Sequence, residues 1–352
     1  MIHGELIALG IAIDKKPEYK KAKAAQDRFD IIFKEILKEW TDKSERYIVG
    51  KNFSGDGHAL QLVWKYGYIL EVGVGHDYDK SCPDTDVLLQ EILQKPLGQF
   101  VQSITVKVTD GGMRGYIDFE SCLSKIVLQG RQPNLKKLVI GDCYPPEADL
   151  SWCSVGDCSG IFSLLPNLEY IKTRGRNVIF GKLKHQKLKK LLVESGGLSA
   201  EAVKSIAKAD LPSLESLEVW FGSKEYGAQG SINMIKPLLQ GKGYPKLKHL
   251  GLMNAEFQNE ITQALVKAPI VKQLSSLDLS MGTMTDKGAQ ALVDNVDTFI
   301  HLDYIDVCDN FLSEQMSSRL RRVYSNKINI SEQGDPDEDE DGDSYIYVSA
   351  GE

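Results

Sequence analysis

Three cysteines and four acidic residues lie close together in the sequence between positions 142 and 158. Thiolates and carboxylates can bind a metal ion or act as nucleophiles, so this is the first place to look for chemistry. The set comprises Cys143, Cys153 and Cys158 with Asp142, Glu147, Asp149 and Asp157. Nine and four residues separate the cysteines, whereas zinc sites favour tighter Cys-x2-Cys pairs. A metal-binding or enzymatic accessory role for this cluster is therefore the alternative hypothesis.

Other motifs that could carry chemistry are incomplete. Five residues separate Gly175 from Gly181-Lys182, one more than in a phosphate-binding P-loop, and Leu183 replaces the required Ser or Thr. The acidic run that starts at Asp337 resembles the beginning of a calcium loop, but its twelfth position is Val348 instead of Glu. The six histidines form no pair at metal-ligand spacing. We therefore expect no catalytic residues, no bound metal and no cofactor.

The remaining candidates are charged and aromatic residues that alternate with regularly spaced leucines. Alternation places such residues on the face of a strand opposite the buried leucines. Large exposed aromatics are typical anchors for a partner, so Trp220 is the main candidate. The alternative is that a loop at 222–227 covers Trp220. We predict that a protein partner contacts Tyr170, Arg174, Glu194, Glu218, Trp220, Met253, Asp278, Tyr304 and Asp306.

The leucines that position these side chains belong to a repeated phrase, Leu-x-x-Leu-x-Leu/Val/Ile. Such a phrase is typical of the strand in a leucine-rich repeat. Copies begin at positions 69, 101, 135, 168, 188, 214, 247, 274 and 302, at spacings of 20 to 34 residues. Segments with helical spacing lie between most copies, and start signals at Ser199 and at Thr285-Asp286 predict where two of these helices begin. The sequence therefore predicts an α/β leucine-rich-repeat solenoid of about nine units, with a curved parallel sheet on the concave side and helices on the convex side.

The boundaries of the solenoid follow from changes in the pattern. Residues 1–66 contain an amphipathic helical stretch at 25–40, which we interpret as an N-terminal cap, and residues 67–330 form the solenoid. Residues 331–352 contain an acidic, disordered run followed by a short apolar end, which could fold back onto the solenoid. The unit at 168–188 is too short for a helix, so we expect a turn or extended segment on its convex side.

Charge and composition limit the class of partner. Residues 331–352 hold nine acidic and no basic residues, so subtracting these charges from the net −7 leaves +2 for residues 1–330. The body carries no basic stripe of the kind that binds nucleic acid. No apolar run is long enough to span a membrane, and the first residues do not resemble a secretory signal. We expect a cytoplasmic protein with reduced cysteines, which binds neither nucleic acid nor membrane.

Several phrases resemble a group of bacterial leucine-rich-repeat proteins of unassigned function, with ribonuclease-inhibitor-like repeats. These are Leu211-Pro-Ser-Leu-Glu-Ser-Leu-Glu-Val-Trp-Phe-Gly-Ser-Lys-Glu-Tyr-Gly227, Leu250-Gly-Leu-Met-Asn-Ala-Glu256, Leu277-Asp-Leu-Ser-Met-Gly-Thr-Met-Thr-Asp-Lys-Gly-Ala289 and Tyr347-Val-Ser-Ala-Gly-Glu352. The resemblance covers about residues 130–352. Residues 4–9 and 63–69 are similar to the leader of other bacterial repeat proteins. The resemblance brings no catalytic residues. Members of the group are encoded beside radical-SAM-type and ATP-grasp-type enzymes, so the resemblance implies an accessory binding role.

Overall fold

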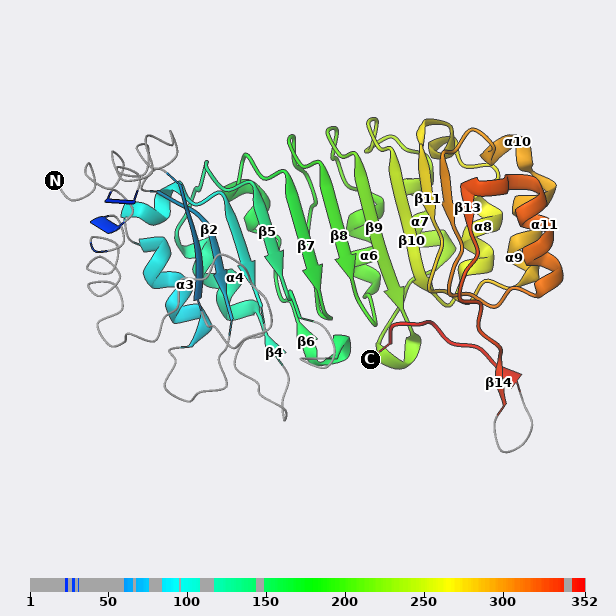
Figure 1. The fold of residues 1–352 in the computed structure, drawn as a ribbon, viewed down its shortest axis with the longest axis horizontal. Helices are drawn as coiled ribbons and strands as arrows, with labels where there is room; N and C mark the ends of the chain where they lie inside the picture. Colours follow the sequence, from blue (N-terminus) through cyan, green and yellow to red (C-terminus); the bar gives the residue numbers. More distant parts are fainter. Residues whose placement is uncertain are drawn as a thin grey trace.

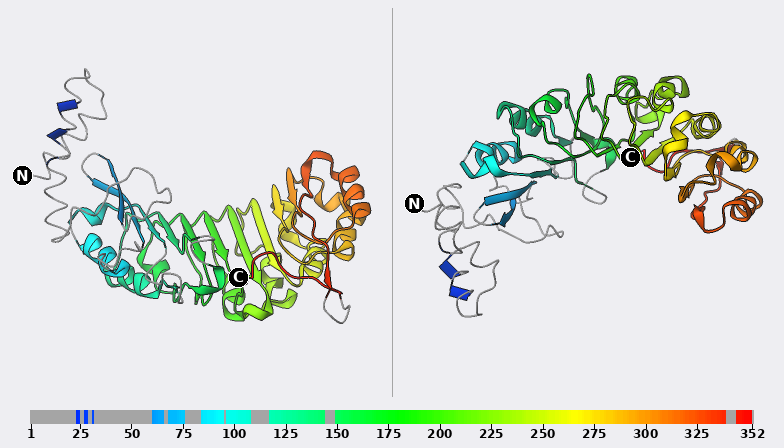
Figure 2. Two further views of the ribbon diagram at one scale, coloured as in Figure 1. Left: turned by 60° about the horizontal axis from the view of Figure 1, so that its bottom comes forward. Right: turned by 90° about the horizontal axis from the view of Figure 1, so that it is seen from above.

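The computed structural model describes residues 60–65, 68–75, 84–94, 96–107, 117–143, 149–338 and 344–351, and five residues between 23 and 31. This part of the chain is a leucine-rich-repeat solenoid with a curved sheet of 11 strands (Figure 1). Seen from above, the sheet follows the inner side of an arc and the helices follow the outer side (Figure 2). Most of the predicted N-terminal helical cap lies outside the described residues.

The repeat phrases form the strands of this sheet. Its order is β1-β2-β3-β5-β7-β8-β9-β10-β11-β12-β13, and each neighbouring pair after β1–β2 is parallel. The strands from the nine predicted units are β2 (Tyr68–Val74), β3 (Ser103–Val106), β5 (Lys137–Ile140), β7 (Tyr170–Arg174), β8 (Lys190–Glu194), β9 (Ser216–Gly222), β10 (His249–Ala255), β11 (Ser276–Asp278) and β12 (Tyr304–Asp306). The predicted fold class is therefore confirmed.

Two edge strands were not expected from the repeat. Residues 60–65 fall in the predicted helical leader, but they form β1 (Leu60–Lys65), which pairs antiparallel with β2. At the other end, β13 (Ile328–Asn329) extends the sheet beyond the ninth unit. Both strands complete the hydrogen bonding of a neighbour whose edge would otherwise be unpaired.

Helices cover the convex side of most units. They are α3 (Thr85–Gln94), α4 (Glu120–Leu128), α5 (Ile161–Leu164), α6 (Ala200–Ala207), α7 (Ile232–Leu239), α8 (Gln258–Leu265), α9 (Asp286–Asp294), α10 (Val296–Phe299) and α11 (Glu314–Tyr324). The start predicted at Ser199 is confirmed, because its hydroxyl accepts a hydrogen bond from the backbone N–H of Ala202 and caps α6. Helix α9 begins at Asp286, directly after Thr285, as its sequence also predicts.

The core between the two layers is a set of apolar ladders. The central residues of five successive strands pair in register, and each is at most 1% exposed: Leu191, Leu217, Leu250, Leu277 and Ile305. Burying a leucine side chain stabilises the fold by about 1.5–3 kcal/mol. Because these residues sit at the same register position in every strand, the side chains on the opposite face are also aligned.

The short unit between β7 and β8 has no helix, as predicted. Its convex side is extended, with isolated bridges that join Ile179 to Asp157 and Lys184 to Asp210. Phe180 is fully buried, and its ring centroid lies 6.2 Å from that of Phe162. One aromatic side chain therefore fills core space that a helix fills in the other units.

The C-terminal tail has a defined path over most of its length. Strands β14 (Asp337–Glu338) and β15 (Ser344–Tyr345) form a small antiparallel sheet, and residues 346–351 then return to the solenoid. Residues 339–343, which hold much of the acidic run, lie outside the described residues. The apolar end therefore folds back only in part, because Val348 is buried whereas Tyr345 and Tyr347 stay exposed.

Asn310 joins two units and gives a test of the repeat packing. Its buried amide donates to the carbonyls of Leu279, Val307 and Cys308, and its oxygen accepts from the N–H of Met284. Asn310→Ala should lower the free energy of unfolding by about 3 kcal/mol, because buried backbone groups lose their partners.

Chemical denaturation measures this loss. Asn233→Ala is the matched control, since the exposed Asn233 side chain accepts a hydrogen bond from Lys236 and its removal should change stability by less than about 0.5 kcal/mol. Equal midpoints for the two variants would contradict the assigned role of Asn310.

Candidate functional site

Strand register gathers the predicted partner-binding residues into rows across the concave face. One row runs through Lys172, Leu192, Glu218, Gly251, Asp278, Asp306 and Asn329, and the row beside it through Tyr170, Lys190, Ser216, His249, Ser276 and Tyr304. A third row pairs Arg174 with Glu194 and, further along, Trp220 with Met253. All nine predicted residues therefore belong to one continuous surface.

The first cluster on this surface is an ion network beside Trp220. Glu194 accepts from Arg174 Nη1 at 2.9 Å and from Lys172 Nζ at 2.7 Å. The guanidinium carbon of Arg174 lies 5.7 Å from the centroid of the Trp220 ring, within the range of a cation–π contact. Two opposite charges around one carboxylate offset much of the cost of burying it.

Burial in this cluster differs from the expectation of open contacts. Arg174 and Glu194 are only 6% and 7% exposed, and Met253 is 7% exposed. Trp220 is half-buried, and its indole N–H has no hydrogen-bond partner among the described residues. Arg174, which Glu194 holds, packs against the Trp220 ring, and the ring keeps part of its surface exposed.

The second cluster is acidic and lies over β9 to β12. His249 contacts Glu218 through Nε2 at 3.4 Å and Ser276 Oγ through Nδ1 at 2.8 Å. Gly251 stands between Glu218 and Asp278 in the row, and a Cβ there would lie 3.1 Å from Glu218 Cγ. The glycine leaves a gap between the two carboxylates.

Two neighbouring carboxylates in this cluster have opposite pKa shifts. Burial and the nearby charge of Asp306 raise the pKa of Asp278, despite its hydrogen bonds with Ser280. Burial also opposes ionisation of Asp306, but hydrogen bonds from Asn329, Cys308 and Tyr304 outweigh it and lower its pKa. Asp306 is thus the stable anion of the pair.

Tyr304 is the most accessible member of the cluster. It is 43% exposed, and its hydroxyl donates to Asp306 Oδ2 at 2.8 Å. Burial and this bond raise the pKa of Tyr304 to about 12, so the hydroxyl stays protonated. Tyr170 lies at the basic end of its row, where Lys137 Nζ is 5.5 Å from the centre of its ring.

Three residues of the surface were not among the predicted contacts. Lys172 and His249 alternate correctly in the sequence, but single charges give no sign that they pair with Glu194 and Glu218. Asn329, which donates to both oxygens of Asp306, lies on β13. The alternation of Ile328 and Ile330 is its one sequence signal.

The cysteines between 142 and 158 lie in the core. Cys143 and Cys153 are fully buried with their sulfurs 3.2 Å apart, and Cys158 is fully buried with a pKa raised by desolvation to about 12. Within the described residues, no three His, Cys, Asp or Glu side chains form a group that could hold a metal ion. Glu147 lies outside the described residues.

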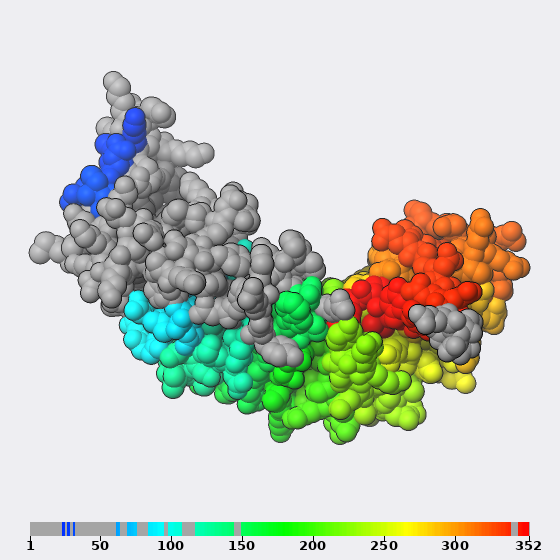
Figure 3. Space-filling view, turned by 90° about the horizontal axis from the view of Figure 1, so that it is seen from below, coloured from blue at the N-terminus to red at the C-terminus, as the bar shows by residue number. Residues whose placement is uncertain are grey.

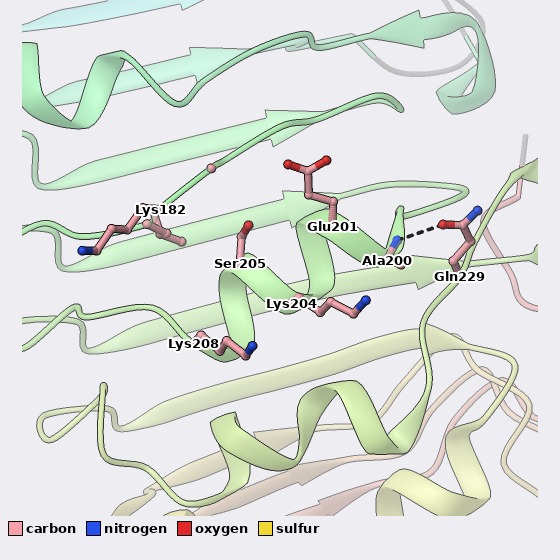
Figure 4. Close-up of a pocket in the computed structure, with 9 residues that line it drawn as sticks. Lys182, Ala200, Glu201, Lys204, Ser205, Lys208 and Gln229 are labelled. Atoms are coloured by element: carbon pink, nitrogen blue, oxygen red, sulfur yellow. Dashed lines mark hydrogen bonds between the residues drawn. The ribbon is translucent and has the colours of Figure 1, made fainter.

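A shallow hollow of 580 Å³ opens on the convex side, next to the short unit. It is lined by Lys182 from the short unit, by Glu201 and Lys204 from α6, and by Lys208, which directly follows α6 (Figure 4). Gly181 and Leu183 also line it, at the place where most other units carry a helix. The missing helix therefore changes the shape of the surface as well as the packing.

In the part of the chain described above, no helix is long and apolar enough to cross a bilayer.

The opposite shifts of Asp278 and Asp306 predict opposite effects of two similar substitutions. A raised pKa means that the folded protein holds the Asp278 proton more tightly than the unfolded chain does. The protonated carboxyl therefore favours the folded state. As pH rises from the unfolded-state pKa of about 3.9 through the higher folded-state pKa, the group ionises and the free energy of unfolding falls. Asp278→Asn should raise the melting temperature at pH 7, and the difference should disappear below about pH 3.

Asp306 has the opposite sign, because its lowered pKa stabilises the folded state above the unfolded-state pKa. Asp306→Asn should lower stability at pH 7 by about 1 kcal/mol, a discounted value because the side chain is half-exposed. This loss should shrink as acid protonates the native carboxylate. Thermal melts of both variants from pH 3 to pH 8 measure the two effects, and shifts of the same sign at pH 7 would contradict the geometry.

Comparisons with known proteins give one informative likeness. No family model and no curated protein matches the chain. The crystal structure of a Bacteroides fragilis protein, a structural genomics target, has a TM-score of 0.64 and 30% identity over 75% of this chain and 72% of that one. An internalin from Listeria monocytogenes has a TM-score of 0.37 and 15% identity over 70% of this chain and 64% of that one. The motif-bearing group suggested by the sequence stays a prediction, but at this identity and coverage the chain belongs to the same family as the Bacteroides fragilis protein.

Proposed function

We propose that the protein is a non-catalytic, cytoplasmic scaffold that binds a protein partner on its concave surface. The supporting observation is the continuous array of aromatic and charged side chains on adjacent strands from β7 to β12. Buried ion pairs and hydrogen bonds already hold many of these side chains in place. A partner then loses less free energy to side-chain ordering when it binds.

The two clusters suggest what the partner presents. Over β9 to β12, the carboxylates of Glu218, Asp278 and Asp306 favour lysine or arginine side chains. Over β9, the accessible part of the Trp220 ring favours an aliphatic or aromatic group. The partner segment therefore combines an apolar anchor at β9 with a basic stretch that extends from β9 toward β12.

Trp220→Ala and Asp278→Ala test this surface. Each should weaken binding of a partner recovered with the unaltered protein by about tenfold or more, because it removes an anchor or an attracting charge. Titration calorimetry with the purified partner measures the change.

Trp152→Ala is the matched control, since Trp152 is 44% exposed and lies outside the concave rows. Melting temperatures confirm that the variants fold. Full affinity in both concave variants, or an equal loss of affinity in the control, would contradict the assignment of Trp220 and Asp278 to the partner-binding surface.

A further inference from the structure

The last described residues dock where the concave strands end. After β15 the chain runs along the edge formed by the carboxyl ends of the strands, toward the end of β9 (Figure 1; Figure 3). We call residues 348–351 the docking segment. We call the residues that receive it, Gly196, Tyr226, Asn254 and Met281, the edge site. These four residues come from the loops or ends that follow β8, β9, β10 and β11.

The edge site holds the docking segment mainly through its backbone. Asn254 is fully buried, and its side-chain amide donates to the carbonyl of Ala350 at 2.6 Å and accepts from the N–H of Ala350 at 2.9 Å. The N–H of Ser349 donates to the carbonyl of Met281 at 3.1 Å. Backbone bonds of this kind are the usual means by which proteins capture extended peptides.

The backbone conformation and the side chain of Asn254 both suit this contact. Its φ of 53° lies in the left-handed region, which asparagine tolerates better than most residues. The backbone N–H of Asn254 donates to the carbonyl of Ser280, whereas the side-chain amide bonds to the docking segment. A buried amide without partners is costly, and the amide of Asn254 finds both of its partners on Ala350.

Glycines on both sides set how close the two chains come. A Cβ at Gly196 would overlap the carbonyl oxygen of Gly351, and a Cβ at Gly351 would lie 2.7 Å from Cε2 of the Tyr226 ring. The site therefore favours glycine at this position of its ligand, because a larger residue would have to displace the Tyr226 ring. No other residue type fits without moving Tyr226.

The rest of the segment alternates as an extended peptide does. Tyr345, Tyr347 and Ser349 are exposed, whereas Val348 is 4% exposed. Val348 and Gly351 are thus the two positions where side-chain size matters, and Ser349 contributes only its backbone.

We propose that the edge site is a peptide-binding site and that the docking segment is its resident, displaceable ligand. Its ligand class is an extended peptide with a valine and, three positions later, a glycine. The contacts above need only the backbone and these two positions, so recognition does not require the covalent link to the solenoid. The link instead supplies a high local concentration of the ligand. This site is separate from the concave rows and does not depend on the proposed scaffold function.

The test uses the full chain and a fluorescent peptide of residues 344–351. Gly351→Val should eject the resident segment, because the added side chain collides with Tyr226, and should leave the repeat core untouched. Fluorescence polarisation should then show saturable peptide binding to this variant. Binding to the unaltered chain should be at least about tenfold weaker, because the tethered segment competes at a high effective concentration.

A second variant separates the site from its ligand. The double variant Asn254→Ala, Gly351→Val should bind the peptide at least about tenfold more weakly than Gly351→Val alone, because both bonds to Ala350 are lost. A peptide with Ser349→Val should bind as well as the native one, and a peptide with Gly351→Val should not bind. Melting temperatures confirm that each protein is folded.

Hydrogen exchange measures directly whether the docking segment is bound or released in each variant. Residues 344–351 should exchange faster in the Gly351→Val and Asn254→Ala proteins than in the unaltered chain, and at the native rate in Ser349→Val. Unchanged exchange in Gly351→Val, absence of peptide binding to that variant, or equal binding with and without the Asn254 amide would each overturn the proposal.

Discussion

The register of the parallel sheet is the constraint on which the rest of this structure depends. Leucine and isoleucine side chains at the same position of successive strands stack into a buried ladder from Leu191 to Ile305. A slip of one residue would move these side chains to the other face and expose them. Because the apolar ladder forbids such a slip, the polar rows of the concave face are aligned as well.

The concave surface divides into a part that is fixed and a part that is available. Arg174 and Lys172 both pair with the carboxylate of Glu194, and all three are mostly buried, so they contribute less open surface than the Trp220 ring, against which Arg174 packs. Toward β12 the carboxylates outnumber the cations and remain partly exposed. The concave surface is therefore asymmetric, with an aromatic side chain on β9 and an excess of carboxylates toward β12.

The carboxyl-terminal edge of the sheet offers different binding groups from its concave face. On the face, side chains carry the recognition chemistry and the backbone is occupied by the strand ladder. At the carboxyl ends the ladder stops, so loop carbonyls and the Asn254 amide become free to bind another backbone. The docking segment uses these groups, and the two glycines allow the close approach. A single solenoid thus carries two surfaces of unlike chemistry next to each other.

The sequence by itself determined the solenoid, the strands of nine units, the helix starts at Ser199 and Asp286, and the missing helix of the short unit. These features depend on periods and caps within about 30 residues, which local physics decides. It also placed all nine predicted contact residues on one face, because alternation along a strand is local.

Only the tertiary structure decided that β1 and β13 form the two edges of the sheet, since neither strand carries the repeat phrase. The burial of Arg174 and Glu194 and the opposite pKa shifts of Asp278 and Asp306 depend on partners from neighbouring strands. The docking of Ala350 on Asn254 joins residues 96 positions apart. Such contacts leave no periodic trace in the sequence, because each depends on two surfaces that come together only after the repeats have stacked.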